Sequence, residues 1–404
     1  MVDPAQLRTC VHCGLCLASC PTYVELGTET DSPRGRIYLM RGLEEGTLAP
    51  TPEVIRHFDG CLGCRACETA CPSGVPYGSL IEATRPFLEQ ARPARTRLGR
   101  RVLGAVLGSR RLRTAAFAPM RLVAGSRWLR RWAPRLPGLW AAYAAALRRQ
   151  RRVRLPVTLE PIGPARGTAV LLTGCVADTL FSDTNAATAA LLQKAGVRVI
   201  VASRDVCCGA LAMHLGLGDA ATTRVRRAAA ALAAPEADWI VTNTAGCGAL
   251  LKEYAHVLPG DAAAAAVAGK TRDALELLAE LGLPPPANAL PRTVAVHDPC
   301  HAAHGQGVRA PARRLLAAVP GLRLVDLEES DWCCGSAGTY NLTEPAMARR
   351  LLERKLDRIA ASGAEVIAAA NPGCLLQIRA GAIARGMTVE VEHPIDLLAQ
   401  AHGV

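Results

Sequence analysis

Short apolar runs bounded by turn residues mark the C-terminal part of this 404-residue chain as a series of buried strands. The runs lie at residues 169–172, 197–201, 239–241, 294–296 and 366–367. A helical pattern at 186–194 precedes one of them, and this alternation of strands and helices predicts α/β domains with parallel sheets.

The apolar runs lead into cysteines, and the pattern of these cysteines repeats. Cys175, Cys207, Cys208 and Cys247 recur after 125 to 127 residues as Cys300, Cys333, Cys334 and Cys374. Such a constant offset indicates duplicated domains, which we place at 165–285 and 290–404. Because ligands bind at the carboxyl edge of open parallel sheets, the cysteines of each half are expected to meet there.

Three interpretations of this second cysteine set stay open: a further metal site, a redox dithiol, or buried thiols that only pack the core. Adjacent cysteines rarely form a relaxed disulfide with each other. Neighbouring histidines are candidate ligands, acid–base groups, hydrogen-bond donors or purely structural residues: His214, His297, His301 and His304.

The N-terminal 90 residues follow a different pattern, with two cysteine runs each ending in Cys-Pro. The first run is Cys10, Cys13, Cys16 and Cys20, and the second is Cys61, Cys64, Cys67 and Cys71. In two-cluster ferredoxins the fourth cysteine of such a run ligates the neighbouring cluster. The spacing therefore predicts two [4Fe–4S] clusters, one held by Cys10, Cys13, Cys16 and Cys71 and the other by Cys61, Cys64, Cys67 and Cys20. Structural zinc, usually held by two separated CxxC pairs, fits this spacing poorly.

Helix-start signals lie between the two runs. Ser32-Pro33 and Thr51-Pro52 each place an N-cap residue before a proline at the first helical position. We therefore expect residues 1–90 to form an α-helical ferredoxin-type module.

Residues 91–160 are expected to form a helical linker. Its 91–155 part holds 18 arginines and no Asp, Glu or Lys, interleaved with apolar residues and interrupted by Pro119, Pro134 and Pro137. It is interpreted either as a basic amphipathic surface for anionic lipid, with Arg110, Arg111, Arg113, Arg130 and Arg131 as contacts, or as a connector whose arginines are solvated or pair with an acidic partner subunit. Nucleic acid is disfavoured because no binding module accompanies the charge.

Composition adds limits. The net charge of +12 comes from the linker, since the rest of the chain carries 29 basic and 35 acidic residues. Sixteen cysteines without an export signal favour metal ligands in a reducing, cytoplasmic compartment over disulfides. No apolar stretch is long enough to span a bilayer, so membrane contact would be peripheral, on the cytoplasmic face of the inner membrane.

These motifs resemble the iron–sulfur subunit of bacterial glycolate oxidase (glycolate dehydrogenase). The resemblance rests on Cys10–Cys16, on the Ser-Pro-Arg-Gly-Arg segment at 32–36, and on the contexts of Cys247 and of Cys333-Cys334-Gly335. It implies an α+β multidomain fold: a two-cluster module, a helical linker and two tandem Rossmann-like cysteine-rich (CCG) domains.

The resemblance also implies a function. Two flavoprotein-type partner subunits, at least one carrying FAD, would oxidise glycolate or D-lactate to glyoxylate or pyruvate, and this chain would pass the electrons to a quinone-type acceptor. The absence of a dinucleotide fingerprint and of a nucleophile elbow agrees with that division. The alternatives are the corresponding subunit of anaerobic glycerol-3-phosphate dehydrogenase, a heterodisulfide-reductase-like enzyme, and a zinc-stabilised interaction protein. Leu250 and Gln377 stand where heterodisulfide reductase has a fifth cysteine in each half, which argues against a noncubane cluster.

Overall fold

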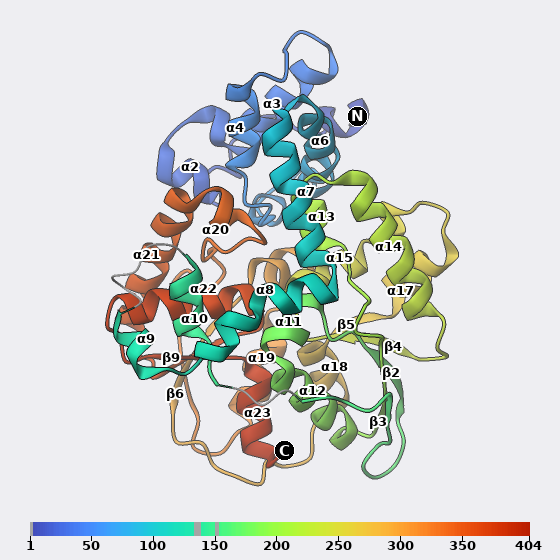
Figure 1. The fold of residues 1–404 in the computed structure, drawn as a ribbon, viewed down its shortest axis with the longest axis vertical. Coiled ribbons are helices and arrows are strands. Elements are labelled where there is room, and N and C mark those ends of the chain that lie inside the picture. The colour runs from blue at the N-terminus through green and yellow to red at the C-terminus, as the bar shows by residue number, and fades with distance from the viewer. Residues whose placement is uncertain (1–2, 133–138, 150–152) are drawn as a thin grey trace.

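The computed structural model describes residues 3–132, 139–149 and 153–404. Figure 1 shows the helical N-terminal module at one end, the linker helices crossing the middle, and the strands gathered toward the other end. The mixed α+β multidomain fold expected from the sequence is confirmed.

The N-terminal module is helical, as predicted. Its helices are α1 (Pro4–Arg8), α2 (Pro21–Leu26), the 3₁₀ turn η1 (Glu29–Asp31), α3 (Pro33–Glu44), α4 (Pro52–Asp59), α5 (Ala66–Thr69) and α6 (Tyr77–Ala91). The Ser32 hydroxyl accepts from Gly35 N–H at 3.0 Å, and Thr51 accepts from Val54 N–H at 3.3 Å, which confirms both N-caps. These helices bury a core of their own and hold the cysteine loops at its edge.

The linker is helical but is more than a connector. It consists of α7 (Ala94–Gly108), α8 (Arg110–Val123), α9 (Arg127–Trp132) and α10 (Leu139–Ala146). Residues of α8, α9 and α10, among them Met120, Leu129 and Ala144, are buried in the core of the second cysteine-rich half. The linker is therefore an integral layer of the C-terminal part.

Two expectations for the linker are wrong. Pro119 does not interrupt the helix, because it and Ala115, whose carbonyl loses its partner there, lie on the exposed side of α8, where water can replace the missing bond. Arg113 is not a surface arginine: it is buried and donates to Thr179 Oγ1 at 3.0 Å and to the carbonyl of Leu107 at 2.8 Å. Pro134 and Pro137 lie outside the described residues, as does the side chain of Arg130.

The first cysteine-rich half has a five-stranded sheet in the order β1-β3-β2-β4-β5. All neighbours are parallel except β1, which pairs antiparallel with β3. Its strands are β1 (Thr158–Leu159), β2 (Gly167–Leu171), β3 (Val197–Val201), β4 (Trp239–Thr242) and β5 (Thr271–Asp273). Its helices are α11 (Cys175–Leu180), α12 (Ser182–Lys194), α13 (Ala210–His214), α14 (Gly218–Ala233), α15 (Ala245–Lys252), α16 (Tyr254–Val257), α17 (Ala262–Lys270) and α18 (Ala274–Leu281).

The second half has an all-parallel sheet in the order β7-β6-β8-β9. Its strands are β6 (Thr293–His297), β7 (Arg323–Val325), β8 (Val366–Ala369) and β9 (Glu390–Glu392). Its helices are the π-helical turn η3 (His301–Gly305), α19 (Ala310–Ala317), α20 (Tyr340–Thr343), α21 (Pro345–Ser362), α22 (Pro372–Ala384) and α23 (Pro394–His402). The order β3-β2-β4-β5 of the first sheet is the same as β7-β6-β8-β9, so the topology repeats as the cysteines do.

The two halves share one apolar core. Residues of β2, β3 and β4 and residues of β6 and β8 belong to a single buried cluster, to which helices α12, α18, α19 and α23 contribute. Because this common core fixes one sheet against the other, the loops at their carboxyl edges are held in a defined relation.

Candidate metal centres and the cavity between them

Cys20 lies with the second cysteine run, not with its own. Cys20, Cys61, Cys64 and Cys67 line one small cavity, together with Arg36 and Tyr77. The chain reaches this arrangement because Pro21 begins α2 directly after Cys20, turning the cysteine away from the loop of Cys10–Cys16.

The two cysteine loops have the same backbone geometry. In each, the residues on both sides of the second cysteine have positive φ: His12 (56°) and Gly14 (86°) around Cys13, and Gly63 (65°) and Arg65 (64°) around Cys64. Left-handed backbone costs energy for His12 and Arg65, which lack the freedom of glycine. Repetition of this strain at equivalent positions indicates a loop shaped to direct three sulfur atoms inward.

Polar groups are directed at the Cys61 sulfur. Gly63 N–H donates to Cys61 Sγ at 3.4 Å, and the Tyr77 hydroxyl donates to it at 3.6 Å. Burial alone would raise the pKa of Cys61, but the positive charges of Arg36 and Arg85 outweigh it and lower the pKa. This environment favours the thiolate, which is the form that binds metal.

Arg36 supplies a buried positive charge beside these sulfurs. It is 1% exposed, donates from Nε to the carbonyl of His57 at 2.7 Å and from a terminal nitrogen to Thr22 Oγ1 at 3.1 Å, and lies 3.5 Å from Asp31. A buried guanidinium next to four cysteines suits an anionic iron–sulfur cluster, whose potential depends on nearby charge and hydrogen bonds.

The other N-terminal set lies nearer the surface. Cys10, Cys16 and Cys71 are partly buried against the core of the module, whereas Cys13 is exposed. Partial burial raises the pKa of Cys16, and the neighbouring Cys10 raises it further. This set therefore occupies the solvent-facing side of the module.

The second cysteine set converges as expected from its position after the strands. In the first half, hydrogen bonds link Cys175 to Cys207 and Cys207 to Cys208, and Cys208 Sγ donates to Cys247 Sγ at 3.2 Å. In the second half the same chain of contacts runs through Cys300, Cys333, Cys334 and Cys374. Each half thus gathers four buried or nearly buried sulfurs at the carboxyl edge of its sheet.

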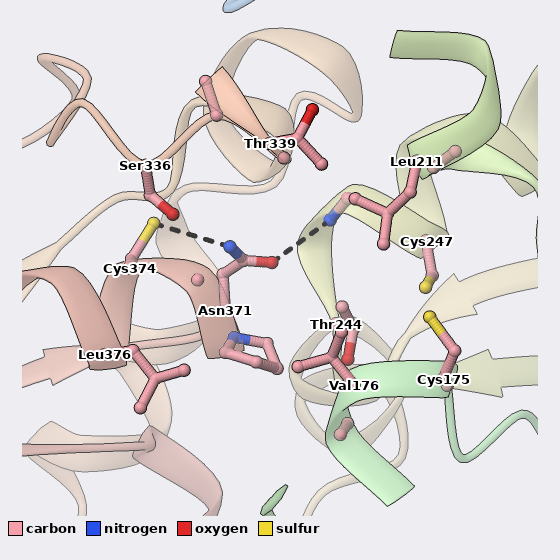
Figure 2. Close-up of a pocket in the computed structure, with 18 of the residues that line it drawn as sticks. Cys175, Val176, Leu211, Thr244, Cys247, Ser336, Thr339, Asn371, Cys374 and Leu376 are labelled. Carbon is pink, nitrogen blue, oxygen red and sulfur yellow. Dashed lines mark hydrogen bonds between the residues drawn. The ribbon is translucent and has the colours of Figure 1, made fainter. Parts of the chain in front are cut away.

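Both sets face a single cavity of about 320 Å³, and all eight of these cysteines line it. Figure 2 shows Cys175 and Cys247 on one wall and Cys374 on the opposite wall. Asn371 lies between them: its amide nitrogen donates to Cys374 Sγ at 3.5 Å, and its amide oxygen accepts from Gly246 N–H at 3.5 Å (Figure 2). The two halves therefore build one site.

The candidate histidines separate into two groups. His214, His297 and His301 line the cavity, whereas His304 lies outside its lining and bonds to Thr69 of the N-terminal module at 2.9 Å. Burial lowers the pKa of His214, as do the nearby His301 and Arg85, so its ring is neutral.

His297 has the environment of a metal ligand. It is 1% exposed, neither ring nitrogen has a hydrogen-bond partner, and one of them lies within 4.8 Å of the sulfurs of Cys334 and Cys374. By the spacing of the repeat, Leu172 occupies its place in the first half. The two halves are therefore chemically unequal, and the second offers a mixed nitrogen and sulfur donor set.

The N-terminal module lies directly against this site. Leu62, Cys300, Cys333 and Tyr340 form one buried cluster, and Cys64 packs against it. Burial raises the pKa of Cys64, and Cys300 adds to the effect. The Tyr340 hydroxyl donates to the carbonyl of Gly60 at 3.0 Å, and Arg65 forms an ion pair with Glu253 of the first half.

Sequence reasoning missed several residues of these sites: Arg36, Tyr77, Tyr143, Asn341 and Asn371. Two of them lay within motifs already singled out, since Arg36 ends the Ser-Pro-Arg-Gly-Arg segment and Asn371 belongs to the repeated flank of Cys374. The other three carried no signal, because only the fold brings them to the sulfurs.

Comparison with known proteins agrees with this architecture. Residues 6–75 match the model of a 4Fe-4S dicluster domain, and residues 169–252 and 294–379 each match that of a cysteine-rich domain, CCG. Among the described residues, no helix is long and apolar enough to cross a membrane.

Curated relatives match along the whole chain. The probable glycolate oxidase iron–sulfur subunit of Bacillus subtilis (strain 168) is 36% identical, covering 100% of this chain and 95% of its own length. The glycolate oxidase iron–sulfur subunit of Escherichia coli (strain K12) is 37% identical over 98% and 94%. The fumarate reductase (CoM/CoB) of Methanothermobacter marburgensis has a subunit that is 27% identical over 99% and 73%. The chain therefore belongs to the family of glycolate oxidase iron–sulfur subunits and is a component of an oxidoreductase.

Proposed function

We propose that this chain is the electron-transfer subunit of a membrane-associated 2-hydroxy-acid dehydrogenase. FAD on a partner subunit takes a hydride from glycolate or D-lactate, giving glyoxylate or pyruvate. Electrons then pass one at a time through two [4Fe–4S] clusters of this chain to a quinone-type acceptor. The chemistry belongs to the cofactors, and the protein positions them and sets their potentials.

The observation that carries the proposal is the position of Cys20. Its place beside Cys61, Cys64 and Cys67 supports a crossed ligand assignment, with Cys71 completing the set of Cys10, Cys13 and Cys16. Crossed ligands are the arrangement of proteins that hold two cubanes within the same small module.

The positions of the two sets suggest an order for the electrons. The set containing Cys13 faces solvent, where a flavoprotein subunit can approach it, while Cys64 packs against Cys300 and Cys333. We assign entry to the exposed cluster and exit through the buried one toward the cavity.

We further assign a metal site to the second cysteine-rich half, with His297, Cys334 and Cys374 as ligands. The unpartnered ring nitrogens of His297 support this assignment, because a buried imidazole without any hydrogen bond is costly unless a ligand satisfies it. The first half offers four sulfurs without a histidine.

Membrane association is assigned to the outer face of the linker. Arg111 and Arg131 are exposed there, as are Leu122 (85%) and Trp128 (65%). Basic and aromatic side chains on one amphipathic surface suit the interface of an anionic membrane.

The test is turnover by the anaerobically purified complex with glycolate, D-lactate and glycerol 3-phosphate as competing substrates. We expect oxidation of a 2-hydroxy acid and a brown chain with at least eight irons, as two cubanes require. Preference for glycerol 3-phosphate would favour the related dehydrogenase instead. A colourless, zinc-loaded chain would contradict electron transfer altogether.

A further inference from the structure

The cavity between the two cysteine-rich halves has a composition that sets the chemistry of its ligand. None of the residues that line it within the described part of the chain is Asp, Glu, Lys or Arg. A carboxylate or phosphate bound here would lose its hydration without gaining a cationic partner, which is strongly unfavourable. The cavity is therefore unsuited to a hydroxy acid, and it suits a neutral molecule.

Apolar side chains cover the cavity on the side of the linker. Leu107 of α7, Phe117 and Met120 of α8, and Trp140 of α10 line it there, so the inner face of the arginine-rich segment is its roof. The volume of about 320 Å³ lies at the lower end of the range of about 300 to 1,000 Å³ found for small-molecule sites.

One corner of the cavity carries neutral polar groups. The Tyr143 hydroxyl donates to Gln377 Oε1 at 2.6 Å and accepts from the amide of Asn341, and that amide also lies 3.3 Å from Gln377 Oε1. Tyr143 and Asn341 both line the cavity. Neutral hydroxyl and amide groups suit the carbonyl oxygens of an uncharged ligand.

The cavity has an opening beside the linker. Trp140 and Leu342 line it and yet are 48% and 53% exposed, so they mark its mouth between α10 and α20. Exposed apolar residues of the linker, Leu112 and Leu122, lie on α8 beside this layer. A ligand with an apolar tail could extend from this mouth toward a lipid surface.

We propose that this cavity binds the ring of a quinone, a neutral planar acceptor, beneath the linker helices. The inference rests on the proposed function, and it locates the acceptor between the two cysteine sets and next to the Cys64 cluster site. Reduction to the quinol takes two electrons, supplied singly through the iron–sulfur sites of this chain, and two protons from solvent water.

The test uses a variant that fills the cavity and a matched control on the same helix. Leu107→Trp adds bulk to the roof, whereas Leu98→Trp adds the same bulk at a position of α7 that is 63% exposed. With decyl-ubiquinone as the acceptor, we expect Leu107→Trp to raise the KM for quinone at least tenfold. The rate with ferricyanide, a water-soluble acceptor, should not change, and Leu98→Trp should match the native complex in both assays.

A second variant removes a single hydroxyl in case Leu107→Trp impairs assembly. Tyr143→Phe should raise the quinone KM by about fivefold, as expected for the loss of one hydrogen bond of about 1 kcal/mol. Binding is also measured without turnover, as quenching of tryptophan fluorescence by decyl-ubiquinone, and Trp140→Phe should remove most of this quenching. Unchanged quinone KM in both cavity variants would overturn the proposal.

Two further outcomes are distinguishable. If the complex oxidises no 2-hydroxy acid, the proposed function fails, but reoxidation of the dithionite-reduced full chain by decyl-ubiquinone still tests the cavity with the same variants. If Leu107→Trp instead loses iron beyond the eight of two cubanes, the space belongs to a cluster and the quinone assignment is wrong.

Discussion

At the scale of single residues, the surroundings of Cys61 decide how the buried cluster site would behave. Its sulfur accepts from Tyr77 and from Gly63, and Arg36 lies beside it without exposure. Each of these groups stabilises negative charge on sulfur, and a cluster gains negative charge on reduction. Together they favour the reduced state.

Tyr77→Phe should therefore lower the reduction potential of this cluster. Loss of one hydrogen bond of about 1 kcal/mol corresponds to about 40 mV for a one-electron couple. The measurement is a redox titration followed by EPR, with Tyr38→Phe as the control, since Tyr38 is 70% exposed. Equal potentials in both variants would show that the hydroxyl does not act on the cluster.

His297→Leu tests the assignment of a metal to the second half. It places there the residue that the repeat already has at Leu172, so the change suits a buried position next to a strand. We expect loss of the metal of that half, measured by elemental analysis, with both cubane EPR signals retained. His304→Gln, outside the cavity lining, should keep the full metal content. Native metal content in His297→Leu would contradict the assignment.

At the scale of elements, α8 and α9 separate the roles of the linker arginines. Arg113 holds α8 to Thr179, whereas Arg111 and Arg131 extend outward. Only the outward arginines are available to lipid, so the effect of neutralisation must depend on which are changed.

The double variant Arg111→Gln and Arg131→Gln should weaken binding to phosphatidylglycerol vesicles. At about 1 kcal/mol per basic residue near an anionic surface, the loss is about 2 kcal/mol, or roughly thirtyfold in affinity. Cosedimentation measures it. Replacement of two exposed arginines of α21, Arg349→Gln and Arg350→Gln, should leave binding unchanged. If both double variants bind as the native chain does, the linker is not the lipid surface.

The N-cap of α18 gives the chain a pH-dependent element. Asp273 is 2% exposed and accepts from Leu275 N–H at 2.9 Å, but its second oxygen has no partner. Burial raises its pKa to about 6, with Glu276 contributing. The folded chain therefore keeps a proton that the unfolded chain releases near pH 4, so this group's contribution to stability falls as pH rises from about 4 to about 6.

Asp273→Asn should remove this dependence and keep the N-cap, since asparagine also caps helices well. Relative to the native chain, the variant should gain stability between pH 4.5 and pH 6.5, by up to about 3 kcal/mol. The measurement is the urea midpoint at both values. A difference between variant and native chain that is the same at pH 4.5 and pH 6.5 would contradict this account.

The sequence predicted the elements better than their assembly. The apolar runs that became β2, β3, β4, β6 and β8 were found because buried parallel strands are continuously apolar. The strands β5, β7 and β9 were missed, since each is short and carries charged residues such as Asp273, Arg323 and Glu390. The role of the linker as a roof was also missed, because its apolar residues acquire a partner only when both halves are in place.

At the scale of the whole molecule, the duplicated halves, the linker and the N-terminal module meet around one group of sulfurs. Local spacing in the sequence predicted which cysteines belong together in each half. It could not predict that the two halves face each other across one cavity, because this depends on the shared core of β2 and β6. The resulting order is an exposed cysteine set, a buried one and then the cavity.

The crossed ligand sets are the central claim, and EPR spectra of four reduced variants test them most directly. Cys13→Ser and Cys64→Ser define the signals of the two clusters, since each cysteine lies in the middle of its own run. We predict that Cys20→Ser loses the same signal as Cys64→Ser, and that Cys71→Ser loses the same signal as Cys13→Ser. If Cys20→Ser instead reproduces the spectrum of Cys13→Ser, the ligands do not cross and the account is wrong.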